Sequence, residues 1–285
     1  MPRPFPACPG VRHAFHDVAT GIRMHVAEAG PEDGPPVVLL HGWPQHWWCW
    51  RGVIPALADA GFRVLAADLR GSGWSDAPPG AYDKETLASD VLALLDTLGI
   101  ERTTLVGHDW GGWTSQLIAL RAPERVERLV LCNIASVWPP SRVKTALNLW
   151  RFGYQVVGVP VLGPAIQRSG LMRRGLPGVP EEDRAEFAAL LREPGRAEAA
   201  SALYRTFATR EAPAVGAGRY TGQRLTMPTL VLHGTGDPVV RPFMVEVFRD
   251  HADDVEIEWV AGTGHFIADE QPALVAERVI AFAAA

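Results

Sequence analysis

The sequence has few cysteines and no long hydrophobic run. Its three cysteines, Cys8, Cys49 and Cys132, are widely spaced, and no pair of them has the spacing of zinc ligands. So sparse and odd a number excludes a disulfide framework and is typical of a reduced, soluble, cytoplasmic protein. The longest apolar runs, such as residues 37–40, are far too short to cross a bilayer, and the proline-rich N-terminus has no signal-peptide core.

A large excess of charge of either sign is also missing. The 285 residues include 27 Lys or Arg and 32 Asp or Glu, which gives a formal net charge of -5 at pH 7. A chain this weakly acidic is a poor candidate for binding nucleic acid or an anionic membrane surface. Because 47% of the residues are hydrophobic and 21% are charged, the composition is that of a globular protein and excludes a disordered one.

Short apolar runs recur along the chain and predict the strands of a sheet. Near-continuous apolar runs of this length are typical of parallel strands that are covered on both faces. A further run, residues 255–260, alternates polar and apolar side chains and predicts a less buried strand. The other runs cover residues 37–40, 63–67, 104–106, 129–131 and 230–232.

Helical patterns separate these strands. Leu87, Val91 and Leu95 recur at helical spacing up to a stop signal at Gly99, and another helix is expected from residue 109 to the residue before Pro123. The alternation of strand and helix predicts a doubly wound α/β fold with a mostly parallel sheet.

The alternation stops between residues 138 and 223, where Arg- and Ala-rich helical patterns replace the strands. Helices inserted between two strands of one sheet predict a cap over a site. We therefore expect three segments: the first part of an α/β core at residues 1–137, a helical cap at residues 138–223, and the second part of the core at residues 224–285.

The segment Gly107-His108-Asp109-Trp110-Gly111 carries the strongest motif. An apolar strand leads into Gly-x-Asp-x-Gly, and a helical pattern follows, which predicts a sharp strand-to-helix turn that presents its central side chain above the sheet. The usual occupant is Ser, and here it is Asp109. A carboxylate is ionised at neutral pH and can attack carbon to form an ester. The alternative is that Asp109 only caps the helix.

Two further strands end in candidate partners for Asp109. Asp237 follows the strand at residues 230–232, and His265 lies in a glycine-rich loop after the last strand, at the same edge of the sheet. The order nucleophile, acid, histidine is that of α/β hydrolases. We expect His265 to activate water and Asp237 to orient it. For Asp237 the alternative is an Asx turn before Pro238. Asn133, which follows the strand at residues 129–131, is another position where related enzymes can hold this acid, but Asn carries no charge.

Backbone N–H groups complete the expected site. The strand at residues 37–40 ends in His41-Gly42-Trp43-Pro44, and the N–H of Trp43, with that of Trp110, would form an oxyanion hole. His41 is expected to make structural hydrogen bonds. Most of the neighbouring tryptophans at positions 47, 48 and 50 are expected to be packing residues.

On these motifs, nearly the whole chain resembles an α/β-hydrolase-fold epoxide hydrolase. The resemblance implies two cap tyrosines that donate hydrogen bonds to the epoxide oxygen and protonate it as the ring opens. Phe152-Gly153-Tyr154-Gln155 is similar to the segment of the first, and Ala202-Leu203-Tyr204-Arg205 to that of the second. It also implies an apolar epoxide and water as the reacting partners, no metal and no organic cofactor. The side chains expected to contact the substrate are Trp43, Trp110, Phe152 and Phe266.

Three matters remain open at this level. Haloalkane and haloacetate dehalogenases share the Asp elbow, and Trp110 matches a halide-binding Trp. However, haloalkane dehalogenases usually have Asn where this chain has Trp43. Haloacetate dehalogenases carry arginines just after the nucleophile, where this chain has Trp110 and Trp113 and its first Arg is Arg121. A non-catalytic ligand receptor of the same fold is the alternative from another class. The sequence also leaves open whether the protein is a monomer or a homodimer.

Of the other tyrosines, Tyr82 is expected in a surface loop and Tyr220 in the linker that returns to the core.

Overall fold

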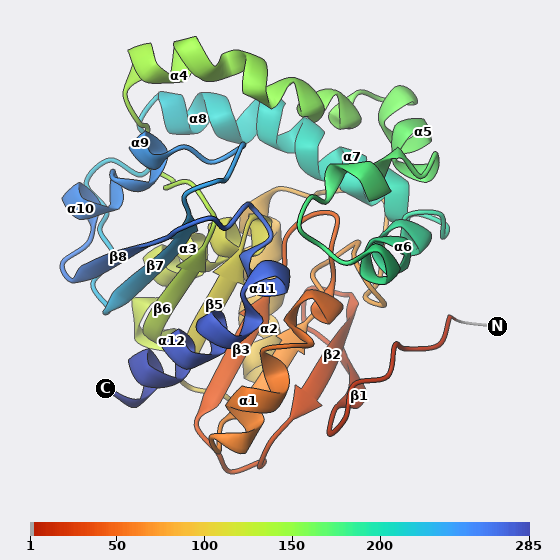
Figure 1. Cartoon of the computed structure of the whole chain (residues 1–285), viewed down its shortest axis with the longest axis vertical. Coiled ribbons are helices and arrows are strands. Elements are labelled where there is room, and N and C mark those ends of the chain that lie inside the picture. Colours follow the sequence, from red (N-terminus) through yellow and green to blue (C-terminus); the bar gives the residue numbers. More distant parts are fainter. Residues whose placement is uncertain (1–2) are drawn as a thin grey trace.

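The computed structural model describes residues 3–285, without the side chains of Leu149, Arg151, Phe152 and Met172. One eight-stranded sheet of order β1-β2-β4-β3-β5-β6-β7-β8 forms its centre (Figure 1). All neighbours from β4 to β8 run parallel, as the apolar runs predict, whereas β2 runs antiparallel to β1 and β4. The strands are β1 (Arg12–Asp17), β2 (Arg23–Ala29), β3 (Pro36–Leu40), β4 (Arg63–Ala67), β5 (Thr103–His108), β6 (Val126–Cys132), β7 (Thr229–Gly234) and β8 (Val255–Val260).

The hairpin of β1 and β2 is absent from the sequence-based prediction. The β1 sequence gives only a weak signal, because four of its six residues are polar and the strand lies partly exposed at the edge of the sheet. In β2 the buried positions include His25, which lies opposite Phe15 in the hairpin register. These two segments therefore form strands because they pair with each other, and neither contains an apolar run from which a strand could be predicted.

Helices cover both faces of the sheet. Val38 and Leu40 of β3 pack in one apolar cluster with α2 and α3, whereas Val37 and Leu39 point the other way and pack with α1 and α12. The predicted helices are confirmed at α2, which ends just before Gly99, and at α3. The core helices are η1 (Trp47–Trp50), α1 (Ile54–Asp59), α2 (Lys84–Thr97), α3 (Trp110–Arg121), η2 (Pro123–Arg125), α9 (Pro242–Val245), α10 (Phe248–His251), α11 (Ile267–Glu270) and α12 (Pro272–Ala284).

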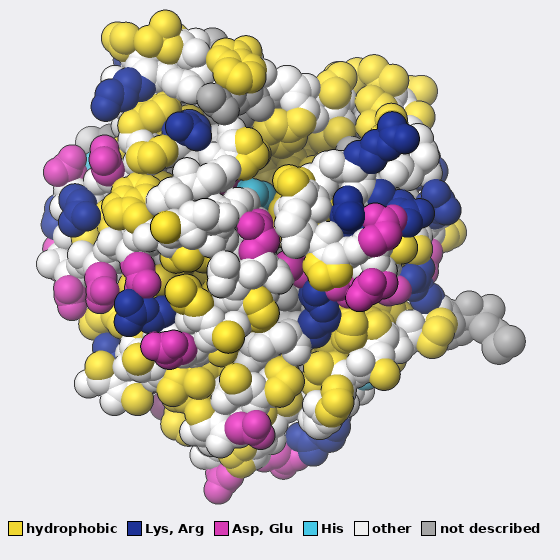
Figure 2. All heavy atoms as spheres, viewed as in Figure 1, with side chains coloured by type: hydrophobic (Ala, Val, Ile, Leu, Met, Phe, Trp, Pro, Cys, Tyr) yellow, Lys and Arg dark blue, Asp and Glu magenta, His cyan; other side chains and the backbone are white. Residues whose placement is uncertain are grey.

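A helical layer lies over one end of the sheet, between β6 and β7 in the chain (Figure 1). No strand occurs among the described residues of this segment. Figure 2 shows hydrophobic side chains gathered along the outside of the layer. Its elements are α4 (Arg142–Asn148), η3 (Leu149–Gly158), α5 (Leu162–Arg168), η4 (Leu171–Gly175), α6 (Glu181–Leu190), α7 (Arg196–Thr206), the π-helical turn η5 (Phe207–Glu211) and α8 (Ala212–Gly216).

A buried lysine ties this layer to the core. Lys84, the first residue of α2, is fully buried, and its Nζ donates to the carbonyl oxygen of Leu203 (3.0 Å) and to Oε2 of Glu211 (2.8 Å). The ammonium also lies 4.2 Å from the ring centroid of Trp110. Burial lowers the pKa of Lys84, and the Glu211 carboxylate acts in the opposite direction. The ion pair therefore joins the start of α2 to the π-helical end of α7.

The predicted surface position of Tyr82 is wrong. Tyr82 is only 3% exposed, because Ala199 and Ala202 of α7 cover its ring, and its hydroxyl donates to the carbonyl oxygen of Pro78. Tyr220 does lie in the segment that returns from α8 to β7. The three cysteines are free thiols, and no helix in residues 3–285 is long and apolar enough to cross a membrane.

We predict that Lys84→Met lowers the free energy of unfolding by about 3 kcal/mol. This is the low end of the range for breaking a buried ion pair, because Glu211 keeps some contact with solvent. Urea unfolding would measure the loss. The double variant Lys84→Met/Glu211→Gln is the control, since it leaves no unpaired charge, and it should be more stable than the single variant. A double variant less stable than the single one would contradict the role of the ion pair.

Candidate active site

Asp109 lies at the turn from β5 into α3. Its backbone has φ 49° and ψ -123°, a strained conformation for a residue other than glycine. Small neighbours make this turn possible: a Cβ on Gly111 would lie 2.3 Å from the carbonyl oxygen of Leu40, and one on Gly42 would lie 2.3 Å from the Cβ of Asp109. Close packing between the turn and the loop after β3 therefore requires glycine at position 111 of the motif and at position 42 of that loop.

The side chain of Asp109 does not cap the helix, although the residue occupies the N-cap position. Instead Oδ1 accepts a hydrogen bond from the backbone N–H of Trp43 (3.0 Å), and Oδ2 lies 3.6 Å from Nε2 of His265. Burial alone would raise the pKa of Asp109, but the hydrogen bond and charge of His265 outweigh it and lower that pKa. Asp109 is thus an ionised, buried carboxylate facing a histidine.

His265 is held between two carboxylates. Its Nδ1 lies 2.8 Å from Oδ2 of Asp237, on the side of the ring opposite to Asp109. Burial would lower the pKa of His265, but the charge of Asp237 and the hydrogen bonds to both carboxylates raise it to about 10. The imidazole is therefore protonated at neutral pH as long as Asp109 is ionised.

Asp237 uses its two oxygens differently. Oδ1 accepts the N–H groups of Val239 (2.7 Å) and Val240 (3.0 Å), so the residue does form the local turn that its position before Pro238 suggests. Oδ2 faces His265 and also accepts a hydrogen bond from Nδ2 of Asn133 (2.8 Å). Burial raises the pKa of Asp237, but the His265 charge and these hydrogen bonds outweigh it and hold that pKa well below its usual value. The turn and the contact with His265 therefore coexist.

Several supporting residues are absent from the sequence-based prediction. Nε2 of His108 donates to the carbonyl oxygen of His265 (2.8 Å), and the carboxylate of Glu270 accepts the N–H groups of Gly264 (2.7 Å) and Phe266 (3.1 Å). Together these bonds fix the loop that carries His265. No local signal marks them, since each depends on contacts between segments that are distant in the chain or on the fold of the loop itself.

Two tyrosines of the helical layer lie close to this carboxylate. Tyr204 of α7 is 2% exposed, with its ring centroid 5.1 Å from that of Trp43 and 5.4 Å from that of Trp110; Tyr154 of η3 lies edge-on to it at 5.8 Å. Burial raises the pKa of both phenols, and the charge of Asp109 adds to this effect. Both therefore remain protonated donors at neutral pH.

Where the structure describes them, the predicted substrate contacts lie in two different apolar clusters, with Trp43 and Trp110 beside Tyr204 and Phe266 beside His265. Phe266 is 4% exposed, and its ring centroid lies 5.1 Å from that of His265. Trp43 and Trp110 flank Tyr204, as described above. The side chain of Phe152 lies outside the described residues.

A hydrogen-bond chain fixes the ring of Trp43. Its Nε1 donates to Oε1 of Gln167 on α5 (3.0 Å), and Nε2 of Gln167 donates to Oγ of Ser201 on α7 (2.9 Å). Gln167 and Ser201 are both fully buried. The residue that offers its backbone N–H to Asp109 is thus held through its side chain by two helices of the layer.

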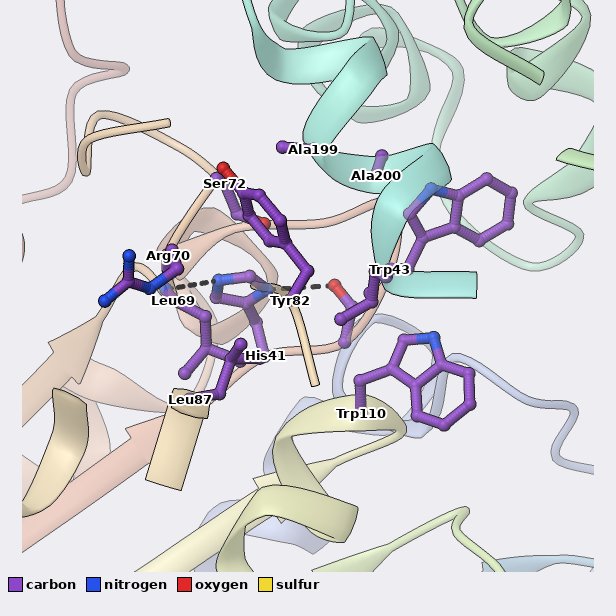
Figure 3. A pocket seen from close by; sticks show the side chains of 13 residues that line it. His41, Trp43, Leu69, Arg70, Ser72, Tyr82, Leu87, Trp110, Ala199 and Ala200 are labelled. Carbon is purple, nitrogen blue, oxygen red and sulfur yellow. Dashed lines mark hydrogen bonds between the residues drawn. The ribbon is translucent and has the colours of Figure 1, made fainter. Parts of the chain in front are cut away.

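A small cavity lies beside these residues, between Trp43, Trp110 and α7 (Figure 3). Its volume of about 20 Å³ has room for a single water molecule. At its inner wall, Nδ1 of His41 donates to the carbonyl oxygen of Gly42 (2.9 Å), and Nε2 accepts from the N–H of Leu69 (3.0 Å). Both ring nitrogens are therefore used in structural bonds, as predicted for His41.

This arrangement suits chemistry at an electrophilic carbon. A buried carboxylate can form an ester, an imidazole in contact with it can handle the proton of a water molecule, and phenols can protonate a departing oxygen. Among the described residues, no group of three or more His, Cys, Asp or Glu side chains is arranged to hold a metal ion.

Comparisons with known proteins place these features in a wider context. A profile of the alpha/beta hydrolase fold matches residues 35–272. The soluble epoxide hydrolase of Corynebacterium sp. is 34% identical over 281 residues, which cover 92% of this chain and 94% of that protein. The AB hydrolase superfamily protein YfhM of Bacillus subtilis is 30% identical over 290 residues and covers 96% and 98%. The structure of epoxide hydrolase CorEH without ligand superposes with a TM-score of 0.83 at 32% identity, covering 96% and 99%.

We predict that Asp109→Asn lowers the pKa of His265 below its value of about 10. The substitution removes the charge of Asp109 and a carboxylate hydrogen-bond acceptor, both of which favour the imidazolium, while Asp237 is retained. NMR titration of the His265 ring would measure the shift. Asp254→Asn, an identical change at an exposed position, is the control and should leave that pKa unchanged. An equal pKa in both variants would contradict the electrostatic contact.

Proposed function

The chain belongs to the alpha/beta hydrolase fold family, and we propose that it hydrolyses small apolar epoxides to vicinal diols through a covalent ester on Asp109. It is an epoxide hydrolase, as are its full-length relative at 34% identity and several of its structural neighbours. The observation that carries the proposed route is the buried Asp109 carboxylate, which contacts His265 and whose charge raises the pKa of both phenols.

Ring opening begins with Asp109 and the two tyrosines. Tyr154 and Tyr204 donate hydrogen bonds to the epoxide oxygen while a carboxylate oxygen of Asp109 attacks a ring carbon. The carbon–oxygen bond of the ring breaks, a phenol gives its proton to the resulting alkoxide, and a hydroxyalkyl ester of Asp109 remains. The high pKa of Tyr204 suits this step, because the phenol is still protonated when the substrate arrives.

Ester formation prepares His265 for the second step. The esterified Asp109 has lost its charge, so a contribution that holds the imidazole protonated disappears and its pKa falls. Once His265 has released its proton to solvent, it takes a proton from a water molecule that attacks the ester carbonyl. The N–H groups of Trp43 and Trp110 stabilise the oxyanion, and Asp237 stabilises the imidazolium. The departing alkoxide takes the proton from His265, the diol leaves, and the proton that Asp109 loses on ionising restores the phenol. His265 then regains from solvent the proton it released, because the ionised Asp109 again favours the imidazolium.

The helical layer has a defined part in this proposal. We assign residues 138–223 as a cap, on the core formed by residues 1–137 and 224–285, because Tyr154, Gln167 and Tyr204 all approach Asp109 or Trp43 from these helices. The aromatic cluster around them favours an apolar epoxide, with water as the second reactant. The free thiols suit the reducing conditions of the cytoplasm.

The dehalogenase alternative is less well supported. A departing halide is usually stabilised by two indole or amide N–H donors. The indole N–H of Trp43 is already bonded to Gln167, so of the two indoles only that of Trp110, which bonds to none of the described residues, is available to a halide. A ligand receptor without catalysis would have no need of the hydrogen bonds that join Asp109, His265 and Asp237.

We predict that His265→Gln accumulates the ester when the protein is mixed with an apolar epoxide. Without the base, attack of water on the ester is slow, whereas no proton passes through His265 when Asp109 attacks the ring. Because the loss of His265 also raises the pKa of Asp109, the variant is mixed with the epoxide at alkaline pH. Intact-protein mass should increase by the full mass of the epoxide, and peptide mapping should place the adduct on Asp109. The double variant Asp109→Asn/His265→Gln is the control and should show no adduct.

Two outcomes of this trapping experiment would contradict the proposal. One is the absence of both adduct and diol over a broad panel of epoxides. The other is an adduct with a haloalkane, lacking the halogen, when no epoxide reacts, which would favour the dehalogenase alternative.

We predict that Tyr154→Phe/Tyr204→Phe lowers the rate of ring opening by roughly 100-fold or more, the range usual for a positioned general acid. Single-turnover measurement of ester formation tests this directly. Tyr220→Phe is the control, because the hydroxyl of Tyr220 bonds to Glu85, and it should open the ring at the normal rate. Unaltered ring opening in the double variant would remove the tyrosines from the mechanism.

A further inference from the structure

Exposed hydrophobic side chains are concentrated on the outer side of the helical layer. Of nine large hydrophobic residues that are exposed in the described part of the chain, eight lie between residues 143 and 171. We call the surface formed by α4, η3, α5 and η4, residues 142–175, the outer cap face; in Figure 2 yellow side chains gather over α4 and α5, with Lys and Arg among them. The eight residues are Val143, Leu147, Trp150, Val156, Val159, Val161, Leu162 and Leu171.

This concentration is not explained by packing against the core. The same elements already bury another set of side chains toward the molecule, including Val157 of η3 and Gln167 of α5. A helix that only covers a core needs one apolar side, with polar residues opposite. Exposed apolar side chains in such number mark a surface that contacts something else.

The charge of the same segment is one-sided. From Trp138 to Pro180 the chain has six Lys or Arg and no Asp or Glu, so this stretch carries +6 while the rest of the chain carries -11. Among the described side chains of the segment, Arg168 pairs with Glu198 and Arg173 with Glu181. The other basic residues of the segment whose side chains are described, Arg142, Lys144 and Arg174, form no ion pair with any described residue.

One exposed residue of this face is held in a strained conformation. Val161, between η3 and α5, has φ 67°, which is rare for a β-branched residue, and it is 86% exposed. Contact with water offers Val161 no stabilisation that would offset its backbone strain. Insertion of its side chain into an apolar medium would offset that strain.

We propose that the outer cap face binds the surface of an anionic lipid bilayer. Aliphatic side chains would enter the outer part of the acyl layer, and the unpaired basic side chains would face lipid phosphates. A second copy of the chain fits less well, because a two-fold interface would place this basic surface against an identical basic surface. The net charge of -5 conceals this surface, since it averages a basic segment with a more acidic remainder.

This inference goes beyond the proposed reaction and does not depend on it. Apolar epoxides partition into lipid, so a hydrolase held at the bilayer surface by its helical layer would take substrate where it is concentrated. Binding to vesicles is nevertheless measurable without any epoxide.

The test is co-sedimentation of the full chain with vesicles. Vesicles of phosphatidylcholine mixed with phosphatidylglycerol should carry the protein down, those of phosphatidylcholine alone should do so weakly, and added salt should reverse the association with the anionic vesicles. Failure of the wild-type protein to associate with anionic vesicles at low salt would overturn the proposal.

Two pairs of substitutions locate the surface. Lys144→Glu/Arg174→Glu and Leu147→Ser/Val161→Ser should each weaken partition onto anionic vesicles by roughly tenfold or more. Arg102→Glu/Arg249→Glu makes the same change of charge at exposed positions outside the face and is the matched control. All variants should turn over an epoxide normally in buffer without vesicles, because none of these residues belongs to the site.

Two other results would contradict the lipid assignment. Equal loss of vesicle binding in the control pair would show that only total charge matters. A dimer in light scattering that Leu147→Ser/Val161→Ser dissociates would assign the face to a second copy of the chain.

Discussion

One imidazolium between two buried carboxylates determines much of the rest of the structure. Asp109 and Asp237 can both remain ionised inside the protein because His265 contacts each of them, at 3.6 Å and 2.8 Å. The two carboxylates and the imidazolium together leave one net negative charge inside the protein, and hydrogen bonds from neutral N–H donors stabilise it. The N–H of Trp43 does so for Asp109, and Asn133 with the N–H groups of Val239 and Val240 does so for Asp237.

The packing around these charges follows from the need to bring backbone donors close. Gly42 and Gly111 permit the loop after β3 to touch the turn after β5, and the side chain of Trp43 is then fixed from the helical layer through Gln167. The rings of Trp43, Trp110, Tyr154 and Tyr204 pack against one another where the layer meets the core. The proposed catalytic groups and the aromatic cluster therefore both lie where the core meets the helical layer.

The sequence was sufficient for those features that are encoded locally. Apolar runs predicted the parallel strands, and glycines around Asp109 and near His265 predicted turns at the ends of strands. The hairpin β1–β2 depends on pairing between polar-rich segments and could not be read in this way. Asn133, Gln167 and Glu270 act on residues whose positions only the folded chain defines. Tyr82 was misplaced because nothing in its own segment indicates that α7 covers it.

The Lys84 ion pair holds one part of the helical layer, the C-terminal end of α7, more firmly to the core than an uncharged contact would. Its ammonium bonds to the backbone beside Tyr204 and to Glu211, so lifting this end of α7 would bring a paired charge out of a closed, apolar setting. The described basic side chains of α4 form no comparable anchor to the core. If the layer opens to admit substrate, this end of α7 should therefore be the last part of it to leave the core.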